Sequence, residues 1–441
     1  MKILQVSTSD LAGGAERSAK NLADAYRARG HDSWLAVGHK RGDDSNVLAL
    51  RNDGARNVVV RGIDHFRREH EPSIRRVRGL GRLASLVRTL AEPGRALATQ
   101  RGREDFAFPG TRRLLDLPPA RPDLVHLHNV HGSYFDLREL PGLSRQVPTV
   151  LNVRDGWLMS GHCAFGIDCE RWKTGCGSCP DLTLFPAIKR DATAFNWERK
   201  RALLAASKLY IATPSQWMMD RVQESIIAPA AIDSRVIPNG VDTITFAPGD
   251  RAAARADLGL APDTRVLLVA ANGLRHNVWK DYATLRGALE RLGTQAWPWP
   301  LVVLAVGETA PAERIGCVEL RFIPFVADSA RLAGYYRAAD VYLHAARVES
   351  FGNVLLEARA CGTAIVATAT GGIPEQVPEG TGLLVRPGDP AAFAEAVATL
   401  LRDDALRTTI ADNGLRHVRQ SFMLDLQAQR FLSWYQEIVR A

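Results

Sequence analysis

Long hydrophobic runs are missing from this sequence. Its 441 residues contain no stretch of about 18 consecutive apolar residues, which a membrane-spanning helix needs. Residues 2–6 have the pattern of a short buried strand, and no apolar segment with a small-residue cleavage site follows them, so they do not resemble a secretory signal. We therefore expect a protein that stays in the cytoplasm.

Two further absences narrow the class of enzyme. The first strand is followed by Gly13-Gly14-Ala15-Glu16 rather than G-x-G-x-x-G, and no acidic residue ends the second strand, where Gly38-His39 stand. Both absences argue against a nicotinamide dehydrogenase. There is also no Asp-x-Asp triplet to hold a divalent ion, so we expect no catalytic metal.

The excess positive charge of the chain is concentrated in one segment. The chain carries 56 Lys and Arg against 48 Asp and Glu, a formal net charge of +8. Thirteen arginines and no lysine lie between Arg61 and Arg113. This insert, residues 61–113, is either a solvated helical surface or a face that meets anionic lipid or a phosphorylated acceptor, which would place the protein at the inner face of the cell membrane. No nucleic-acid module accompanies it, so we expect no nucleic-acid partner.

The order of apolar strands, glycine-bearing loops and amphipathic helices is repeated twice. Such alternation predicts parallel sheets covered on both faces, and the length suits two domains. The predicted fold class is therefore α/β, with two Rossmann-like domains whose parallel sheets face a central cleft. The expected domains are 1–240, with the arginine-rich insert and a cysteine-rich loop at 154–185; 241–421; and a C-terminal helix at 422–441 that packs across the boundary.

The segment from Glu349 to Glu357 carries two carboxylates separated by seven residues. It follows a predicted strand at 341–344 and leads into a helix, so the carboxylates lie at most about 12 Å apart along the helix axis. That separation suits the sugar and the ribose at the two ends of a nucleotide diphosphate, with helix-start amides facing the phosphates between them. Taken alone, this pattern also fits two surface glutamates.

Two loops supply further candidates. The loop of residues 272–280 follows the first strand of the second domain and contains Arg275 and Lys280, which could stabilise a leaving diphosphate without a metal. The sequence Gly371-Gly372-Ile373-Pro374-Glu375 follows another strand. Its glycines allow the backbone to approach a ligand, and Pro374 begins a helix.

Together, in this order, these elements resemble retaining glycosyltransferase family 4, which has the GT-B fold. The resemblance covers nearly the whole chain. Its motifs are Gly13–Glu16, residues 123–128, Pro214-Ser215-Gln216-Trp217, residues 237–242, residues 336–340, the segment from Glu349 to Glu357, which is the most specific, and Gly371 to Glu375.

The resemblance implies a role for each matching residue. Glu349 lies by the anomeric carbon of the donor sugar, Glu357 bonds the ribose hydroxyls, and Arg275 and Lys280 hold the diphosphate. The transfer retains anomeric configuration, and a donor phosphate oxygen takes the acceptor's proton. The expected catalytic residues are Glu349, Arg275, Lys280 and Asp155; the expected donor-binding residues are Glu357, Gly352, Asn353, Val354, Gly14, Gly372 and Phe325.

The chain departs from the family at one position. Many relatives have a His-Asp pair after the strand at 149–153, and this chain has Arg154-Asp155. Either Arg154 binds phosphate, or a histidine from elsewhere contacts the donor sugar. We expect His128, His131 and Arg154 to contact the sugar or the acceptor, with His162 as a further substitute.

Four cysteines cluster in the loop at 154–185. Cys163, Cys169, Cys176 and Cys179 have the spacing C-x5-C-x6-C-x2-C. The final pair suits a metal knuckle, whereas the two longer spacings are not those of standard zinc fingers. A structural zinc and free thiols are both open, ahead of disulfides or an iron–sulfur cluster. A similar loop occurs in a bacterial subset of the family that builds surface polysaccharide.

The sequence therefore predicts a metal-independent retaining glycosyltransferase. Its partners would be a nucleotide-diphosphate sugar donor, a glycan or lipid-linked hydroxyl acceptor and an anionic membrane surface. Two alternatives stay open. One is a nucleotide-sugar 2-epimerase of similar shape, which would need no acceptor, and the other is a non-catalytic basic protein that binds membranes or nucleic acid.

Overall fold

The computed structural model describes residues 1–11, 13–52, 62, 87 and 90–440. Much of the arginine-rich insert, residues 61–113, lies outside the described residues. The chain divides into two compact units. Unit 1 comprises Met1–Asp10, Gly30–Ala212 and Arg221–Ser234, and unit 2 comprises Leu11–Arg29, Thr213–Asp220 and Arg235–Ala441.

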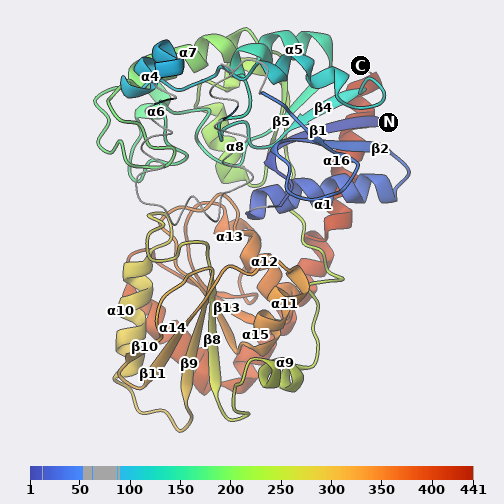
Figure 1. Cartoon of the computed structure of the whole chain (residues 1–441). Coiled ribbons are helices and arrows are strands. Elements are labelled where there is room, and N and C mark those ends of the chain that lie inside the picture. Colours follow the sequence, from blue (N-terminus) through green and yellow to red (C-terminus); the bar gives the residue numbers. More distant parts are fainter. Residues whose placement is uncertain (12, 53–61, 63–86, 88–89, 441) are drawn as a thin grey trace. The chain divides into compact units, whose positions relative to one another are not determined.

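A seven-stranded sheet forms the centre of unit 1 (Figure 1), in the order β3-β2-β1-β4-β5-β6-β7. The pairs from β3 through β6 are parallel. The strand order reverses between β1 and β4, as in a doubly wound sheet. The strands are β1 (Lys2–Ser9), β2 (Asp32–His39), β3 (Val47–Ala49), β4 (Leu124–Leu127), β5 (Thr149–Asn152), β6 (Leu209–Thr213) and β7 (Ala231–Val236).

Helices and a long loop complete the described part of unit 1. The short helices α4 (Pro93–Gln100) and η2 (Pro109–Asp116) lie beyond residue 89, where the last internal gap in the described residues ends. Helix α7 (Thr193–Ala205) packs against α5 (Leu140–Gln146). The cysteine-rich loop contains only the one-turn helix α6 (Arg171–Thr174).

Unit 2 has a second seven-stranded sheet, in the order β10-β11-β9-β8-β12-β13-β14. All its pairs are parallel except β10 with β11. The order again reverses, here between β8 and β12. The strands are β8 (Arg265–Ala270), β9 (Leu301–Val306), β10 (Glu313–Ile315), β11 (Val318–Ile323), β12 (Val341–His344), β13 (Ala364–Thr368) and β14 (Leu383–Val385).

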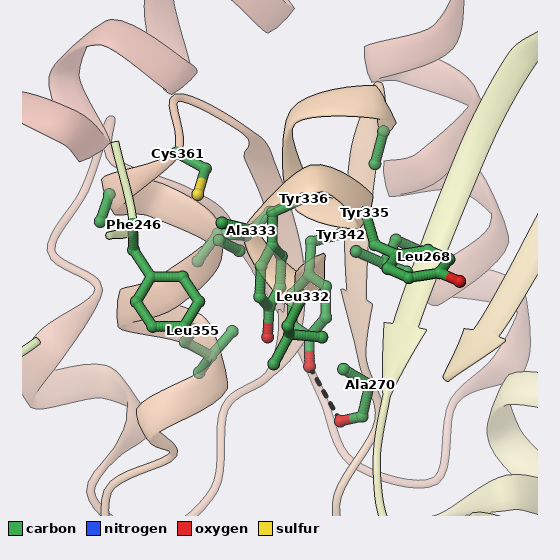
Figure 2. Close-up of a cluster of buried hydrophobic side chains, with 14 of the residues drawn as sticks. Phe246, Leu268, Ala270, Leu332, Ala333, Tyr335, Tyr336, Tyr342, Leu355 and Cys361 are labelled. Carbon is green, nitrogen blue, oxygen red and sulfur yellow. Dashed lines mark hydrogen bonds between the residues drawn. The ribbon is translucent and has the colours of Figure 1, made fainter. Parts of the chain in front are cut away.

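Alternate residues of these strands fill two cores, one on each face of the sheet. Leu267 and Val269 pack with α10 (Tyr282–Gly293) and α14 (Pro390–Arg402), while Leu268 and Ala270 pack with α11 (Ser329–Ala338) and α12 (Asn353–Ala360). The second core contains Tyr336 and Tyr342, which lie side by side in Figure 2 with ring centroids 5.5 Å apart. The Tyr342 hydroxyl donates to the Ala270 carbonyl at 3.3 Å.

The remaining helices of unit 2 are α1 (Gly14–Ala28), α8 (Gln216–Gln223), which continues into unit 1, α9 (Arg251–Asp257), α13 (Ile373–Gln376), α15 (Asp404–Ser421) and α16 (Leu424–Arg440). Helix α1 packs against α16, and the Tyr26 and Tyr435 hydroxyls lie 3.2 Å apart. The prediction of an α/β chain with two mainly parallel sheets is confirmed. Among the described residues, no helix combines the length and the apolar character that crossing a membrane requires.

Candidate functional site

The loops after β8 and β12 carry the main candidates in unit 2. These strands are neighbours at the point where the strand order reverses, and ligands of doubly wound sheets bind outside the carboxyl ends of strands at such points. Lys280 comes from the loop after β8 and Glu349 from the loop after β12. Lys280 Nζ donates to Glu349 Oε2 at 2.5 Å, so the structure brings these two predicted residues together.

The Glu349 carboxylate is mostly buried, with 17% of its side chain exposed. Burial alone would raise its pKa, but the Lys280 ammonium and the neighbouring His344 imidazole outweigh burial and lower it well below the ordinary value. His344 Nε2 lies 3.6 Å from the same carboxylate oxygen. The carboxylate is therefore held as an anion at the start of α12.

Helix α12 begins after a turn that only glycine forms without strain. Gly352 has φ +82°, and a Cβ there would lie 3.3 Å from both Glu349 Cγ and Leu355 Cδ1. The N-cap residue Gly352 has no side chain to cap this helix, and within the described part of the chain no side chain is recorded as accepting from the amides of Asn353 and Val354. These amides are thus left for another acceptor, and their positive partial charge favours an anion.

Glu357 lies about one turn along α12 and is buried. Tyr336 Oη donates to Glu357 Oε2 at 2.9 Å, and Arg17 Nη1 of α1 lies 3.6 Å from Oε1. Burial raises the pKa of Glu357, while Arg17 and Tyr336 oppose that rise. The sequence did not identify Arg17, and it included Tyr336 in the motif at 336–340 without a role. Neither residue has a spacing that signals contact with Glu357.

Glu357 borders a pocket with about 330 Å³ of empty space, part of it open to solvent. A Cβ on Gly14 would lie 3.9 Å from Asn353 Nδ2, so two predicted donor-binding residues meet here. Asn239 and Gln427 support the pocket: Asn239 Nδ2 donates to Asn353 Oδ1 at 2.9 Å, and Gln427 Nε2 to Asn239 Oδ1 at 3.4 Å. The lining residues are Gly14, Arg17, Ser18, Asn21, Gly240, Val241, Asp242, Phe246, Asn353 and Glu357.

Three other predicted residues make no side-chain hydrogen bond or ion pair with Lys280 or Glu349 in the described part of the chain. The Arg275 guanidinium lies over the Phe322 ring and has Nη1 3.7 Å from Glu313 Oε1, so these side-chain contacts are on β10 and β11. The Phe325 side chain, after β11, is 51% exposed. The Gly372 amide donates to the Glu349 carbonyl at 3.0 Å.

The predicted residues of unit 1 form a second group, at the ends of β4 and β5. His131 Nε2 lies 2.9 Å from Asp155 Oδ2, and the Trp157 amide donates to Asp155 Oδ1 at 2.9 Å. Burial would raise the pKa of Asp155, but His131 outweighs it and the pKa is lowered. The His131 ring also faces Trp157 and the half-exposed Phe185.

His128 and His162 are less accessible than His131. His128 is 3% exposed and its Nε2 lies 2.7 Å from Gln5 Oε1, while burial, His126 and Arg154 lower its pKa well below the ordinary value. His162 is 1% exposed and contacts the Pro186 carbonyl and Cys179. His131 is thus the histidine of the three best placed to meet a ligand of unit 1.

The structure does not support the predicted four-sulfur zinc site. Among the described residues, which include all four clustered cysteines, no group of three Cys, His, Asp or Glu side chains is placed to hold a metal ion. Cys163, Cys169, Cys176 and Cys179 are free thiols that line one apolar cavity. Cys176 Sγ accepts the Gly161 amide at 3.1 Å, and Cys179 Sγ lies 3.4 Å from His162 Nε2, so the sulfurs have separate partners.

Lys200 orders this loop, a role that the sequence did not reveal. It is fully buried, and its Nζ donates to the Trp157 carbonyl at 2.9 Å and to the Ser160 carbonyl at 3.1 Å. Glu104 Oε1 accepts from the same ammonium at 3.0 Å. Burial also raises the pKa of Cys163 and of Cys176 to about 11, which keeps both thiols protonated at neutral pH.

Both halves of the chain match models of known glycosyltransferase families. The family described as Glycosyltransferase Family 4 matches residues 12–244, and the one described as Glycosyl transferases group 1 matches residues 265–403. D-inositol 3-phosphate glycosyltransferase of Actinosynnema mirum is 37% identical over 218 residues, 45% of this chain and 51% of that protein. D-inositol 3-phosphate glycosyltransferase 1 of Catenulispora acidiphila is 30% identical over 313 residues, 68% of each chain.

Solved glycosyltransferases share the fold over the whole chain. Sucrose-phosphate synthase from Thermosynechococcus elongatus has a TM-score of 0.64 at 20% identity, covering 99% of this chain and 98% of its own. Anabaena Alr3699/HepE, solved in complex with UDP-glucose, has a TM-score of 0.60 at 20% identity, covering 99% and 100%. These matches confirm the GT-B fold.

The chain spans about half the length of the curated relatives it matches first. One relative is nevertheless covered over two thirds of its length, and the Family 4 match extends over more than half of this chain. On both grounds the protein belongs to glycosyltransferase family 4.

Proposed function

We propose that this protein transfers a sugar, with retention of anomeric configuration, from a nucleotide-diphosphate sugar to a hydroxyl acceptor. The observation that carries the proposal is the Lys280–Glu349 pair at 2.5 Å, directly before the uncapped start of α12. An anion and a cation beside free helix amides suit the sugar and diphosphate of such a donor. Alr3699/HepE, which shares the fold, was solved with UDP-glucose.

In the proposed arrangement the donor lies along α12. Glu349 faces the anomeric carbon, Lys280 moves onto the diphosphate with the Asn353 and Val354 amides, and Glu357 accepts the ribose hydroxyls. Gly14, Gly372 and Phe325 complete the donor site, and Arg275 reaches the diphosphate after leaving Glu313. No metal takes part, since the cationic side chains balance the charge that develops on the leaving diphosphate.

The reaction exchanges one bond for another at the anomeric carbon. The acceptor oxygen bonds to that carbon, the bond from carbon to the donor phosphate oxygen breaks, and the acceptor proton passes to that phosphate oxygen. Glu349 stabilises the positive charge that develops on the sugar ring. In unit 1, His131 and Asp155 bind the acceptor, and Arg154 contributes positive charge there.

The acceptor we propose is a glycan or a lipid-linked hydroxyl at an anionic membrane surface. The basic insert at 61–113 supports that surface through its charge. The relatives named D-inositol 3-phosphate glycosyltransferases support a phosphorylated polyol as a further acceptor class to test.

The donor can be found by thermal shift with UDP-, GDP-, ADP- and dTDP-sugars, since a bound donor stabilises the folded state. Release of nucleotide from that donor, with and without acceptors, then measures turnover. We expect Glu349→Gln to lower turnover by at least about 100-fold in a folded protein, because it removes charge at the reacting centre. Glu379→Gln, at an exposed position, is the matched control. Normal turnover by Glu349→Gln, or epimerised donor without transfer, would refute the proposal.

A further inference from the structure

Three segments far apart in the sequence meet around the backbone of Glu349. They are Ser215 with the first residues of α8, the loop of Glu349 and Ser350, and the segment from Gly371 to Glu375. All three belong to unit 2. All three lie in motifs of the family resemblance. From the segments of Ser215 and of Gly371 to Glu375, the proposed donor contacts use only Gly372.

The carbonyl groups of Glu349 and Ser350 are each held by a different segment. The Gly372 amide donates to the Glu349 carbonyl at 3.0 Å, and Ser215 Oγ donates to the Ser350 carbonyl at 2.9 Å. A Cβ on Gly371, which has φ +57°, would lie 1.9 Å from the Glu349 carbonyl oxygen. Only glycine therefore permits this approach.

Glu375 joins the other two segments to each other. Its Oε2 accepts the Gln216 amide at 2.6 Å and its Oε1 accepts the Trp217 amide at 2.7 Å. A carboxylate that accepts the first amides of a helix satisfies donors that the helix cannot use and complements the helix dipole. The Glu375 residue itself is exposed, whereas Ser215 is 1% exposed.

The contacts close a triangle: Ser215 to Ser350, Glu349 to Gly372, and Glu375 back to Gln216 and Trp217. We propose that Ser215 and Glu375 are positioning residues that fix the backbone of Glu349 for sugar transfer. This inference rests on the proposed function of Glu349. Because a misplacement of about 1 Å can cost about 100-fold in rate, freeing one side of the triangle should slow turnover without removing any group that touches the nucleotide.

The test compares Glu375→Ala, Glu375→Gln and Ser215→Ala with the control Glu379→Ala, an exposed position four residues beyond Glu375. Glu375→Gln keeps one acceptor oxygen and should rescue part of the loss. With UDP-glucose as probe, we expect Glu375→Ala and Ser215→Ala to lower kcat for UDP release by at least about 10-fold. The Kd for UDP should stay within about two-fold of that of the unaltered protein.

Hydrogen exchange measured by mass spectrometry tests the triangle without turnover. Glu375→Ala should speed exchange of amides in residues 216–220 and also in residues 349–355, more than 120 positions away in the sequence. Faster exchange in the first segment alone would overturn the triangle. Unchanged kcat in Glu375→Ala, where Glu349→Gln is inactive, would overturn the positioning role alone, whereas active Glu349→Gln would refute the proposed function instead.

Discussion

Replacing Lys200 by methionine should destabilise unit 1 severely. The substitution keeps most of the side-chain volume but removes three donated hydrogen bonds, to Glu104 and to the Trp157 and Ser160 carbonyls. It also leaves the Glu104 carboxylate, 9% exposed, without its cation. Removing one partner of a buried ion pair costs about 3–5 kcal/mol.

The expected loss can be read as a thermal shift. In domains of about 150–250 residues, each kcal/mol moves the unfolding midpoint by about 2–4 °C. Lys200→Met should therefore lower the midpoint by about 6–20 °C, measured by circular dichroism. Cys163 and Cys176 should also react faster with a thiol reagent, because the loop that covers them loses two of its anchors.

Two variants separate charge from packing. Adding Glu104→Gln to Lys200→Met removes the unpaired buried carboxylate charge. It keeps an oxygen for the Trp157 indole, which donates to Glu104 Oε1 at 2.7 Å. The double variant should therefore recover at least half of the lost stability. Arg201→Met changes a neighbouring side chain that is 56% exposed, and should cost less than about 1 kcal/mol. A Lys200→Met protein as stable as the Arg201→Met control, or a double variant no better than Lys200→Met, would contradict this account of the loop.

Three further predictions concern acid stability, metal and membrane. The folded-state pKa of Glu349 is lowered, so the ionised carboxylate stabilises the fold above the unfolded pKa of about 4.3, and this stabilisation is lost as pH falls. The destabilisation caused by Glu349→Gln should therefore shrink between pH 7 and pH 3. A difference in unfolding midpoint that stays constant over this range would contradict the prediction. Brief EDTA treatment should leave turnover unchanged, and activity that returns only with Mg²⁺ or Mn²⁺ would disprove the metal-free reaction. The protein should sediment with anionic vesicles at low salt and detach at high salt; equal binding to neutral vesicles would return the arginine-rich insert to an ordinary solvated surface.

Buried parallel strands were the part of the fold most readily predicted. The sequence predicts an apolar strand at residues 341–344, and β12 has these bounds. The sequence did not reveal β3, β10 and β14, which have three residues each. Such short strands at or near a sheet edge depend on partners elsewhere in the chain rather than on a pattern of their own.

The candidate site was predictable where chemistry follows a strand, and not where distant side chains meet. Lys280 and Glu349 stand in loops after adjacent parallel strands, so topology brings them together. Arg17 reaches Glu357 from 340 positions away in the sequence, and no local spacing signals that contact. For the four clustered cysteines, the spacing left a structural zinc and free thiols both open, because spacing along a loop does not determine where each sulfur points.

The division of the chain has a consequence for anyone who cuts or recombines it. The polypeptide passes from one unit to the other five times, after Asp10, Arg29, Ala212, Asp220 and Ser234. A fragment that begins at residue 241 would lose α1, and with it the partner of Tyr435 on α16. A chimera that exchanges the rest of unit 2 should therefore carry Leu11–Arg29 and Thr213–Asp220 from the same parent, or replace their contacts one by one.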